Sequence, residues 1–235
     1  MGVLYMNNEA RVLSQAPSIS LQQDFTKQIK EFGYQFIKRM FDIIIALFGL
    51  LFFLPVYLLV KIIYVSKGDF SPIFYFQTRV GLNGVPFKIY KFRTMVPNAD
   101  EMLKEMLKQK KYQDEWKKFQ KFDNDPRVTK VGRILRKTSL DEMPQLINML
   151  KGELSLIGPR PLVVGELESH GGNAKIYNSV KPGVTGWWAV NGRSRMDYKK
   201  RLRLEYYYIK NKSLALDAKI FFKTFKILST HEGAK

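Results

Sequence analysis

The stretch "FDIIIALFGLLFFLPVYLLV", residues Phe41 to Val60, decides the fold of this chain. It is almost entirely apolar apart from Asp42, and about 20 such residues are enough for a helix to cross the hydrocarbon core of a bilayer. A polar stretch precedes it and no small-residue cleavage site follows it, so a removable signal peptide fits it poorly. We therefore predict a membrane anchor over residues 35–67.

The path of this anchor through the membrane stays open from the residues alone. Pro55 lacks a backbone donor and bends a helix. Basic residues flank both ends, Lys38 and Arg39 before the run and Lys61 and Lys67 after it, so a spanning helix leaves one group on the wrong side of the membrane. A re-entrant helix that is broken at Pro55 accounts for both features. An ordinary transmembrane helix with a tolerated proline is the alternative.

Composition limits the class of partner. The 235 residues can bury one sizeable core. Lys and Arg total 39 against 21 acidic residues, a formal charge of +18, which indicates nucleic acid, an anionic membrane surface or a phosphate-bearing substrate. The absence of cysteine excludes disulfides and thiolate metal sites, and two distant histidines argue against zinc. Mg²⁺ held by carboxylates and substrate phosphates remains available.

The rest of the sequence predicts an α+β fold that is mostly helical. The runs "IFYFQTRV" and "FKIYKFRT" flank Asn83–Gly84 and predict a small β-hairpin. Residues 98–122 predict one charged amphipathic helix, and a helix at about 144–151 ends at Gly152. Two helical runs cover about 197–229, whereas residues 1–30 are polar, without a clear period, and at most locally helical.

The last helical run, "DAKIFFKTFKIL", is basic and amphipathic. Such a helix can lie in the headgroup layer with its aromatic face inserted. It can equally pack on a core and expose its lysines to solvent. The residues alone do not decide between these two interpretations.

An adjacent pair of acids, Asp141–Glu142, stands in "KTSLDEMPQLINML", residues 137–150. Ser139 and Glu142 match a capping box, which makes Glu142 a structural cap but puts Pro144 at a helical position where its missing donor matters. A helix that begins at Asp141 puts Pro144 in the first turn and keeps Asp141 ionised at the positive helix end, where phosphate also binds. Asp141 is then a plausible nucleophile and Glu142 a Mg²⁺ ligand. Spacing alone favours the cap.

Several loops carry cations that suit a diphosphate. Each cation alone is a solvated surface charge, but together they match phosphate oxygens, because guanidinium forks bind them bidentately. They are Lys91 and Arg93 in "KFRTM", Arg136 in "RILRKTS", Arg160 in "LIGPRP" and Arg193 in "VNGRSR".

Five long motifs in fixed order resemble the bacterial sugar transferase family. They are "KRMFDIIIALFGLLFFLP", "FKIYKFRTM", "NDPRVTKVGRILRKTSLDEMPQLINMLKGELSLIGPRP", "KPGVTGWWAVNGR" and "LEYYYIKNKSLALDAKI". The resemblance covers roughly residues 37–229. It is to the small monotopic phosphoglycosyl transferases that begin capsule, lipopolysaccharide, exopolysaccharide and glycoprotein assembly.

The resemblance implies a chemistry for the acidic pair. Asp141 attacks the β-phosphate of a UDP-sugar, releases UMP, and passes the phosphosugar to polyprenol (undecaprenyl) phosphate, with Glu142 helping to bind Mg²⁺. Other residues match basic or acidic family positions and are expected to bind phosphate or uridine or to support the site: Lys91, Arg93, Arg136, Arg160, Arg193 and Asp217. The resemblance also favours the re-entrant helix broken at Pro55.

The expected organisation follows from this resemblance. It has a polar extension over residues 1–34, an anchor over 35–67, and a catalytic domain over 68–235 at the cytoplasmic face of the inner membrane, with lipid but no nucleic acid as a partner. The chain departs from its relatives at Leu54, where they often have serine, and at "GWWAVNGR", where Trp187–Trp188 and Ala189 are unusual. The donor sugar, oligomeric state and final glycan stay open.

Two other classes of function compete with this interpretation. A metal-dependent glycosyltransferase that uses the acidic "DND", Asp123–Asp125, releases UDP instead of UMP. However, Asp125–Pro126 is more typical of a turn. A non-enzymatic membrane-anchored protein that binds anions explains the charge but not the acidic pair.

Overall fold

The structure is a computed structural model that describes residues 3–119, 122, 124–192 and 196–230 of the chain. It divides into two compact units, Met1–Phe41 and Asp42–Lys235. The described part of the first unit, from Val3 onward, is a single stretch of helix. All of the predicted site residues belong to the second unit, which is described below.

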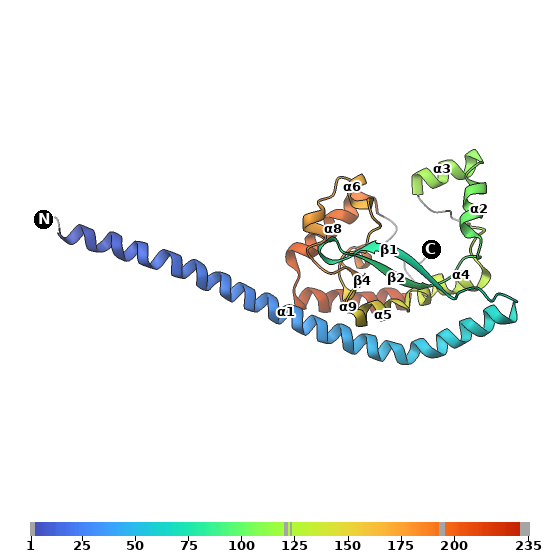
Figure 1. Cartoon of the computed structure of the whole chain (residues 1–235), viewed down its shortest axis with the longest axis horizontal. Helices are drawn as coiled ribbons and strands as arrows, with labels where there is room; N and C mark the ends of the chain where they lie inside the picture. The colour runs from blue at the N-terminus through green and yellow to red at the C-terminus, as the bar shows by residue number, and fades with distance from the viewer. Residues whose placement is uncertain (1–2, 120–121, 123, 193–195, 231–235) are drawn as a thin grey trace. The chain divides into compact units, whose positions relative to one another are not determined.

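The longest element is α1, Val3–Ser66, which contributes to both units (Figure 1). Its portion Gln23–Ser66 is long and apolar enough to cross a membrane, with a mean hydropathy of 2.9 in its most apolar window. The expectation that residues 1–30 are only locally helical is wrong, because the helix already begins at Val3. The chain stays helical through Pro55, so no interruption accompanies that proline, and the re-entrant path stays a prediction.

Asp42, the one charge in the apolar run, has a structural explanation. Its side chain is 3% exposed, and its Oδ1 accepts hydrogen bonds from Ser155 Oγ at 3.0 Å and from the Leu156 backbone N–H at 2.8 Å. Both donors lie in strand β3, Ser155–Ile157. Asp42 therefore ties α1 to β3, because a buried carboxylate is tolerated only where donors satisfy it.

The predicted hairpin is confirmed. Strands β1, Phe74–Val80, and β2, Pro86–Phe92, pair antiparallel with Phe74 opposite Phe92, and the turn η1, Leu82–Gly84, joins them. Asn83 takes a positive φ of 55° in that turn, which asparagine tolerates better than most residues. The hairpin carries Lys91 to the point where β2 ends.

The predicted single helix over 98–122 is wrong, because the chain forms two helices there. They are α2, Ala99–Met106, and α3, Lys110–Phe119. The Gln113 side chain donates to the Leu107 carbonyl at 2.7 Å and so satisfies a group that the break frees. The turn lets the Tyr112 and Trp116 rings pack on Phe122 at centroid distances of 5.5 and 5.3 Å.

The remaining elements follow the sequence closely. Helix α5 ends at Gly152, which has a φ of 82°, as the glycine predicts. The predicted helical pair at the C-terminal end is also confirmed, and β3 pairs in parallel with β4. The elements are α4, Lys130–Lys137; η2, Leu140–Glu142; α5, Gln145–Lys151; α6, Glu166–Ser169; α7, Ala174–Tyr177; β4, Gly183–Thr185; η3, Ala189–Asn191; α8, Tyr198–Asn211; and α9, Leu214–Thr230.

Three buried clusters hold these elements together. One joins α1, the hairpin and α4, a second joins α1, β2 and α5, and a third lies among β3, α8 and α9. Helix α9 buries Ile220 completely but leaves Phe222 and Phe225 mostly exposed. It therefore packs on the core through one face, as the core-packing interpretation expects. Another face presents aromatic rings, which the interpretation as a helix in the headgroup layer requires.

The contact between α4 and the end of β2 sets where the acidic pair stands. The Thr129 hydroxyl caps α4 by accepting from the Gly132 N–H at 2.9 Å, and the Thr129 N–H donates to the Thr94 carbonyl at 3.0 Å. A Cβ on Gly132 would stand 1.9 Å from that Thr94 carbonyl oxygen. Only glycine allows the helix to approach the strand this closely.

Replacing Gly132 by alanine should therefore destabilise the protein. We expect Gly132→Ala to lower the free energy of unfolding by about 3 kcal/mol or more, because backbone must move to admit the new carbon. Gly33→Ala is the matched control, since nothing beyond its chain neighbours and the backbone of its own helix lies within 4 Å of the added carbon. Thermal unfolding in detergent measures both, and equal melting temperatures for the two variants would contradict the close approach.

Candidate active site

Asp141 and Glu142 lie in η2, the short turn between α4 and α5. Ser139, just before it, has a φ of 58° and its side chain caps nothing, so the predicted capping box does not form. The alternative, a helix that begins at Asp141, is also wrong, because α5 begins at Gln145 with Pro144 as its first flanking residue. Proline fits there because the first N–H groups of a helix have no partner within it.

The backbone is strained immediately before the acidic pair. Among the described residues, Ser139 and Asn83 are the non-glycine positions with a positive φ. Such conformations cost roughly 1–3 kcal/mol for ordinary residues and often occur at functional sites. The left-handed Ser139 turns the chain so that the pair stands apart from both helices.

Asn148 fixes α5 against the edge of β2. Its side chain is fully buried, accepts from the Tyr90 N–H at 3.0 Å and donates to the Lys88 carbonyl at 2.8 Å. A second donation goes to Glu153 at 2.6 Å. The amide thus pairs with β2 as a neighbouring strand would, which holds the start of α5, and the acidic pair before it, beside Lys91.

Lys91 and Glu142 form the direct link between the strand and the acidic pair. Lys91 Nζ lies 2.7 Å from Glu142 Oε1, and their side chains are 26% and 38% exposed. An ion pair this open to water adds little stability. Its consequence is orientation, because it fixes one oxygen of Glu142 and leaves the carboxylate accessible.

Asp141 is more buried and has a perturbed pKa. Burial, and secondarily the neighbouring Glu142, raise the pKa of Asp141 to about 6, against the opposing effect of Lys91 and Arg136. The expectation that a helix end stabilises its ionised form is therefore wrong. The carboxylate is still mostly ionised at neutral pH, and its raised pKa makes it more basic than an exposed aspartate.

Arg136 reaches the acidic pair from α4. Its Nε donates to the Thr94 hydroxyl at 2.9 Å, which links it to the end of β2. Its charge also acts on Asp141, lowering the pKa of that residue. The structure thus brings Lys91, Arg136, Asp141 and Glu142 together, as the sequence predicts.

Arg160 is held by its backbone. Its N–H donates to Glu205 Oε1 at 3.0 Å, and its carbonyl accepts from the Tyr177 hydroxyl at 2.9 Å. Its guanidinium lies 5.6 Å from the centre of the Trp188 ring, and its buried Nε has no hydrogen-bond partner. Burial raises the pKa of Glu205 to about 8, so this residue is largely neutral at pH 7 and acts as a structural acceptor.

Sequence reasoning missed two arginines beside Arg160. Arg201 Nη2 lies 2.8 Å from Glu166 Oε1, and Arg79 Nη1 lies 4.0 Å from the other oxygen of Glu166. Burial, and secondarily the charge of Arg160, lower the pKa of Arg79. Two guanidinium groups therefore contact the Glu166 carboxylate. Burial opposes the lowering of its pKa, which is caused mainly by the hydrogen bond from Arg201, with the charge of Arg160 as a further cause.

This basic cluster also explains one of the unusual tryptophans. Trp188 lies under both Arg160 and Arg201, at 5.6 and 5.7 Å from its ring centre. Such cation–π contacts stabilise like charges that would otherwise repel. Arg79 is the last residue but one of β1, so hairpin geometry could have placed it. Nothing in the charged sequence of α8 distinguishes Arg201 from its neighbours.

Arg93 has a structural role in the structure, and its expected phosphate contact stays a prediction. Its guanidinium donates to the Pro72 carbonyl at 2.7 Å, to the Met95 carbonyl at 3.0 Å, and to Asp69 Oδ2 at 2.9 Å. These contacts use all three of its nitrogens to hold the loop before β1. A phosphate could bind Arg93 only by displacing them.

Asp217 has its hydrogen-bond partner in a different part of the fold from the acidic pair. Asp217 is buried and accepts from the Tyr208 hydroxyl at 2.8 Å, within the cluster that supports β3 and the Arg160 loop. Arg193 lies outside the described residues. The competing acidic motif has a structural explanation at Asp125, whose carboxylate binds Arg127 at 2.9 and 2.7 Å, while Asp123 is also outside the described residues.

A metal ion at this site would need ligands from the substrate in addition to those of the protein. Within the described part of the chain, no group of three or more His, Cys, Asp or Glu side chains could hold an ion. Mg²⁺ is commonly held by one or two carboxylates together with substrate phosphates and water. The accessible carboxylate of Glu142 fits that pattern.

The pKa of Asp141 makes the stability of the protein depend on pH. The folded-state pKa of about 6 exceeds the ordinary value of 3.8, so ionising Asp141 destabilises the folded state. The protonated Asp141 therefore stabilises the folded state at low pH, and this stability is lost progressively as the pH rises from about 4 to about 6. We expect Asp141→Asn to be more stable than the natural chain by about 2 kcal/mol at pH 7.5, and by much less at pH 4.

Unfolding in denaturant at both pH values measures this difference. The exposed Asp114 in α3 offers the control, since Asp114→Asn removes the same charge without a buried site. A stabilisation by Asp141→Asn that is equal at pH 4 and pH 7.5 would rule out an unfavourable ionised Asp141.

Comparison with known proteins identifies the family. The family model described as bacterial sugar transferase matches residues 33–231. An undecaprenyl-phosphate galactose phosphotransferase of Salmonella typhimurium is 45% identical over 201 residues, which cover 85% of this chain and 42% of that protein. A UDP-galactose-lipid carrier transferase of Erwinia amylovora is 44% identical over 201 residues, with the same 85% and 42% coverage.

A third relative is nearer to this chain in length. The exopolysaccharide production protein ExoY of Sinorhizobium fredii is 43% identical over 198 residues, which cover 84% of this chain and 87% of that protein. The chain thus spans less than half the length of two of these relatives and most of the third. Because the family model covers the anchor, the hairpin and the acidic pair alike, the chain belongs to the bacterial sugar transferase family.

Proposed function

We propose that this chain transfers a sugar-1-phosphate from a UDP-sugar to polyprenol phosphate through a covalent intermediate on Asp141. The observation that carries the proposal is the environment of Asp141, a mostly buried carboxyl group with a pKa of about 6 beside Glu142, Lys91 and Arg136. Two relatives are named for transfer to undecaprenyl phosphate or to a lipid carrier. The reaction begins the synthesis of a surface polysaccharide or glycoconjugate.

The reaction has two balanced steps. In the first, a carboxylate oxygen of Asp141 attacks the β-phosphorus of the donor, and the bond from that phosphorus to the bridging oxygen breaks. UMP leaves with the electron pair, and a phosphosugar remains on Asp141. In the second, a phosphate oxygen of polyprenol phosphate attacks the same phosphorus, and the Asp141 carboxylate leaves, which regenerates the enzyme.

The residues around Asp141 divide the work of this reaction. Mg²⁺, when bound with Glu142 as its protein ligand, would neutralise charge on the diphosphate. Lys91 orients Glu142, and Arg136 supplies a second positive charge to the phosphates. Arg160 binds the donor from the basic cluster, where its guanidinium stands over Trp188 and is positioned by Glu205 and Tyr177.

The anchor is proposed to enter and leave the same face of the inner membrane, with residues 68–235 on the cytoplasmic side. The basic residues Lys38 and Arg39, and Lys61 and Lys67 beyond the apolar run, then all lie in the cytoplasm. The exposed Phe222 and Phe225 of α9 support an additional contact with the membrane surface.

Product analysis separates this function from its competitors. The purified chain, Mg²⁺, polyprenol phosphate and each of UDP-galactose, UDP-glucose and UDP-N-acetylgalactosamine should yield UMP with at least one donor. Asp141→Asn should lower the rate by at least about 10³-fold, because it removes the nucleophile. Asp114→Asn should leave the rate unchanged. Release of UDP would indicate a conventional glycosyltransferase, and turnover by Asp141→Asn would contradict the nucleophile.

The pH dependence of the same reaction reports on Asp141. The nucleophile must be ionised, so UMP release should fall by about tenfold for each pH unit below the pKa of about 6. Above pH 7 the rate should no longer depend on this group. A rate that stays constant from pH 7.5 down to pH 4.5 would contradict a reacting carboxylate with this pKa.

A further inference from the structure

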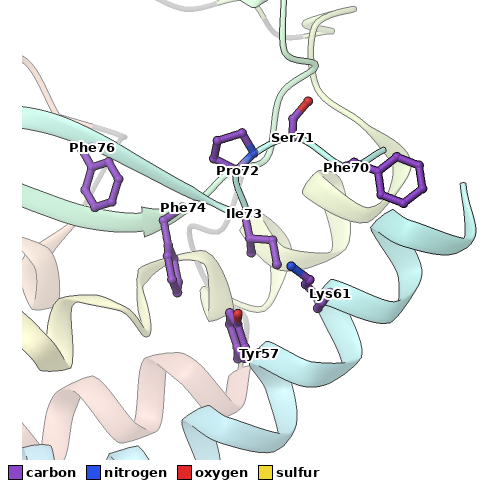
Figure 2. Close-up of a pocket in the computed structure, with 8 residues that line it drawn as sticks. All are labelled: Tyr57, Lys61, Phe70, Ser71, Pro72, Ile73, Phe74 and Phe76. Carbon is purple, nitrogen blue, oxygen red and sulfur yellow. The ribbon is translucent and has the colours of Figure 1, made fainter. Parts of the chain in front are cut away.

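A groove lies between α1 and the segment that leads into β1 (Figure 2). Its volume is about 290 Å³, and aromatic rings of Tyr57, Phe70, Phe74 and Phe76 line it. Of the residues that line it, all in the described part of the chain, Lys61 alone carries a charge. In Figure 2 the Lys61 ammonium points toward the chain at Pro72 and Ile73, not away from the protein.

One wall of this groove belongs to the membrane anchor. Tyr57 and Lys61 are on α1, whose neighbouring residues Leu58, Leu59 and Ile62 are 49%, 58% and 64% exposed. Exposed apolar side chains on this helix are suited to lipid, because no protein covers them. A ligand that reaches the groove along this face of the helix would come from the lipid phase.

Stacked aromatic rings extend from the groove to β2, the strand that carries Lys91. The rings of Tyr57 and Phe74 stack with centroids 5.6 Å apart, and Phe74 stacks on Phe92 at 5.7 Å. Phe92 directly follows Lys91, the residue that binds Glu142 at 2.7 Å. A continuous layer of aromatic rings therefore connects the groove to the strand that carries Lys91.

The same buried cluster flanks the acidic pair itself. Leu140 and Met143, the residues immediately outside Asp141–Glu142, pack against the cluster that contains Phe92 and Ile73. The groove and the acidic pair thus share one apolar wall. A ligand with an apolar chain in the groove and a phosphate at its end has both of its parts accommodated.

We propose that this groove binds the first isoprene units of the acceptor polyprenol phosphate. The inference rests on the proposed function and extends it, since it assigns the acceptor to a part of the chain that is distinct from the donor's basic cluster. A branched apolar chain is complementary to the aromatic lining, and the phosphate is complementary to Lys61, which attracts it as the lipid enters. A phospholipid with an anionic headgroup shares part of this chemistry, and the experiment below distinguishes the two.

The first test measures the two half-reactions separately in nanodiscs. Without acceptor, one equivalent of UMP per enzyme reports the donor step; with acceptor, steady-state turnover gives the KM for polyprenol phosphate. The variants are Phe76→Ser, Phe70→Ser and Lys61→Gln, whose side chains line the groove. Matched controls are Phe25→Ser, which removes an exposed ring from the part of α1 before residues 35–67, and Lys104→Gln, an exposed lysine on α2.

We expect the groove variants to release UMP without acceptor as the natural chain does, and to raise the KM for polyprenol phosphate by about tenfold or more. The control variants should change that KM by less than about twofold. Groove variants with an unchanged acceptor KM would overturn the inference while leaving the proposed function intact. Absence of the UMP burst in the natural chain would instead count against the covalent mechanism.

The second test measures binding without catalysis. A benzophenone-bearing isoprenyl phosphate is photocrosslinked to Asp141→Asn in nanodiscs of phosphatidylcholine and phosphatidylglycerol. We expect crosslinks in the segments 57–61 and 70–76 that excess polyprenol phosphate prevents and excess phosphatidylglycerol does not. Equal competition by phosphatidylglycerol would reassign the groove to bulk phospholipid, and crosslinks confined to other segments would also overturn the inference.

Discussion

The fully buried amide of Asn148 is the interaction on which the arrangement of the active site most depends. It makes hydrogen bonds to both backbone groups that β2 presents at Lys88 and Tyr90, and so takes the place of a missing neighbouring strand. Helix α5 is fixed by this pairing, and the acidic pair precedes α5 directly. The distance between Lys91 and Glu142 is therefore set by a residue that touches neither of them.

Asp42 has the corresponding role for the membrane anchor. Its buried carboxylate joins α1 to β3, and β3 leads into the loop that carries Arg160. One polar residue in the apolar helix thus connects that helix to the strand before Arg160. In the function proposed above, this links the part of the chain that would contact lipid to a part that would bind the donor.

The site carries costs that a purely structural turn would avoid. Ser139 adopts a left-handed conformation, and burial disfavours the ionised form of Asp141. Both features place a basic carboxylate at the end of a strained turn, close to positive charge. Sequences that lack such features are more stable. Proteins therefore usually retain them only where they serve a reaction.

Local turn chemistry explains what the sequence could predict. The hairpin around Asn83–Gly84 and the end of α5 at Gly152 follow from residues that favour a positive φ, and both are found. The start of α5 at Gln145 also agrees with the predicted helix over about 144–151. The turn that holds Asp141–Glu142 was not predictable from Ser139 and Glu142, because the packing of Gly132 on Thr94 fixes α4 and leaves Ser139 in a conformation that cannot cap. A local rule was overridden by a contact that is distant in the sequence.

The same distinction holds for the charged residues. Lys91 and Arg136 meet the acidic pair as expected, because each lies at the end of an element that adjoins it. Arg93 is only two residues from Lys91, but its guanidinium donates to Pro72, Met95 and Asp69 instead. No motif in the sequence reveals these contacts. The cluster of Arg79, Arg160 and Arg201 joins three distant segments, so only the folded chain brings it together.

The most direct measurement of the central claim traps the aspartyl phosphate that the mechanism requires. The chain is incubated with Mg²⁺ and a UDP-sugar without acceptor, then reduced with borohydride, which converts an aspartyl phosphate to homoserine, and mapped by peptide mass spectrometry. The account predicts homoserine at position 141, in the tryptic peptide of residues 138–151, only when the donor is present. UMP formation without homoserine at position 141, or with homoserine at another acidic residue, would contradict it.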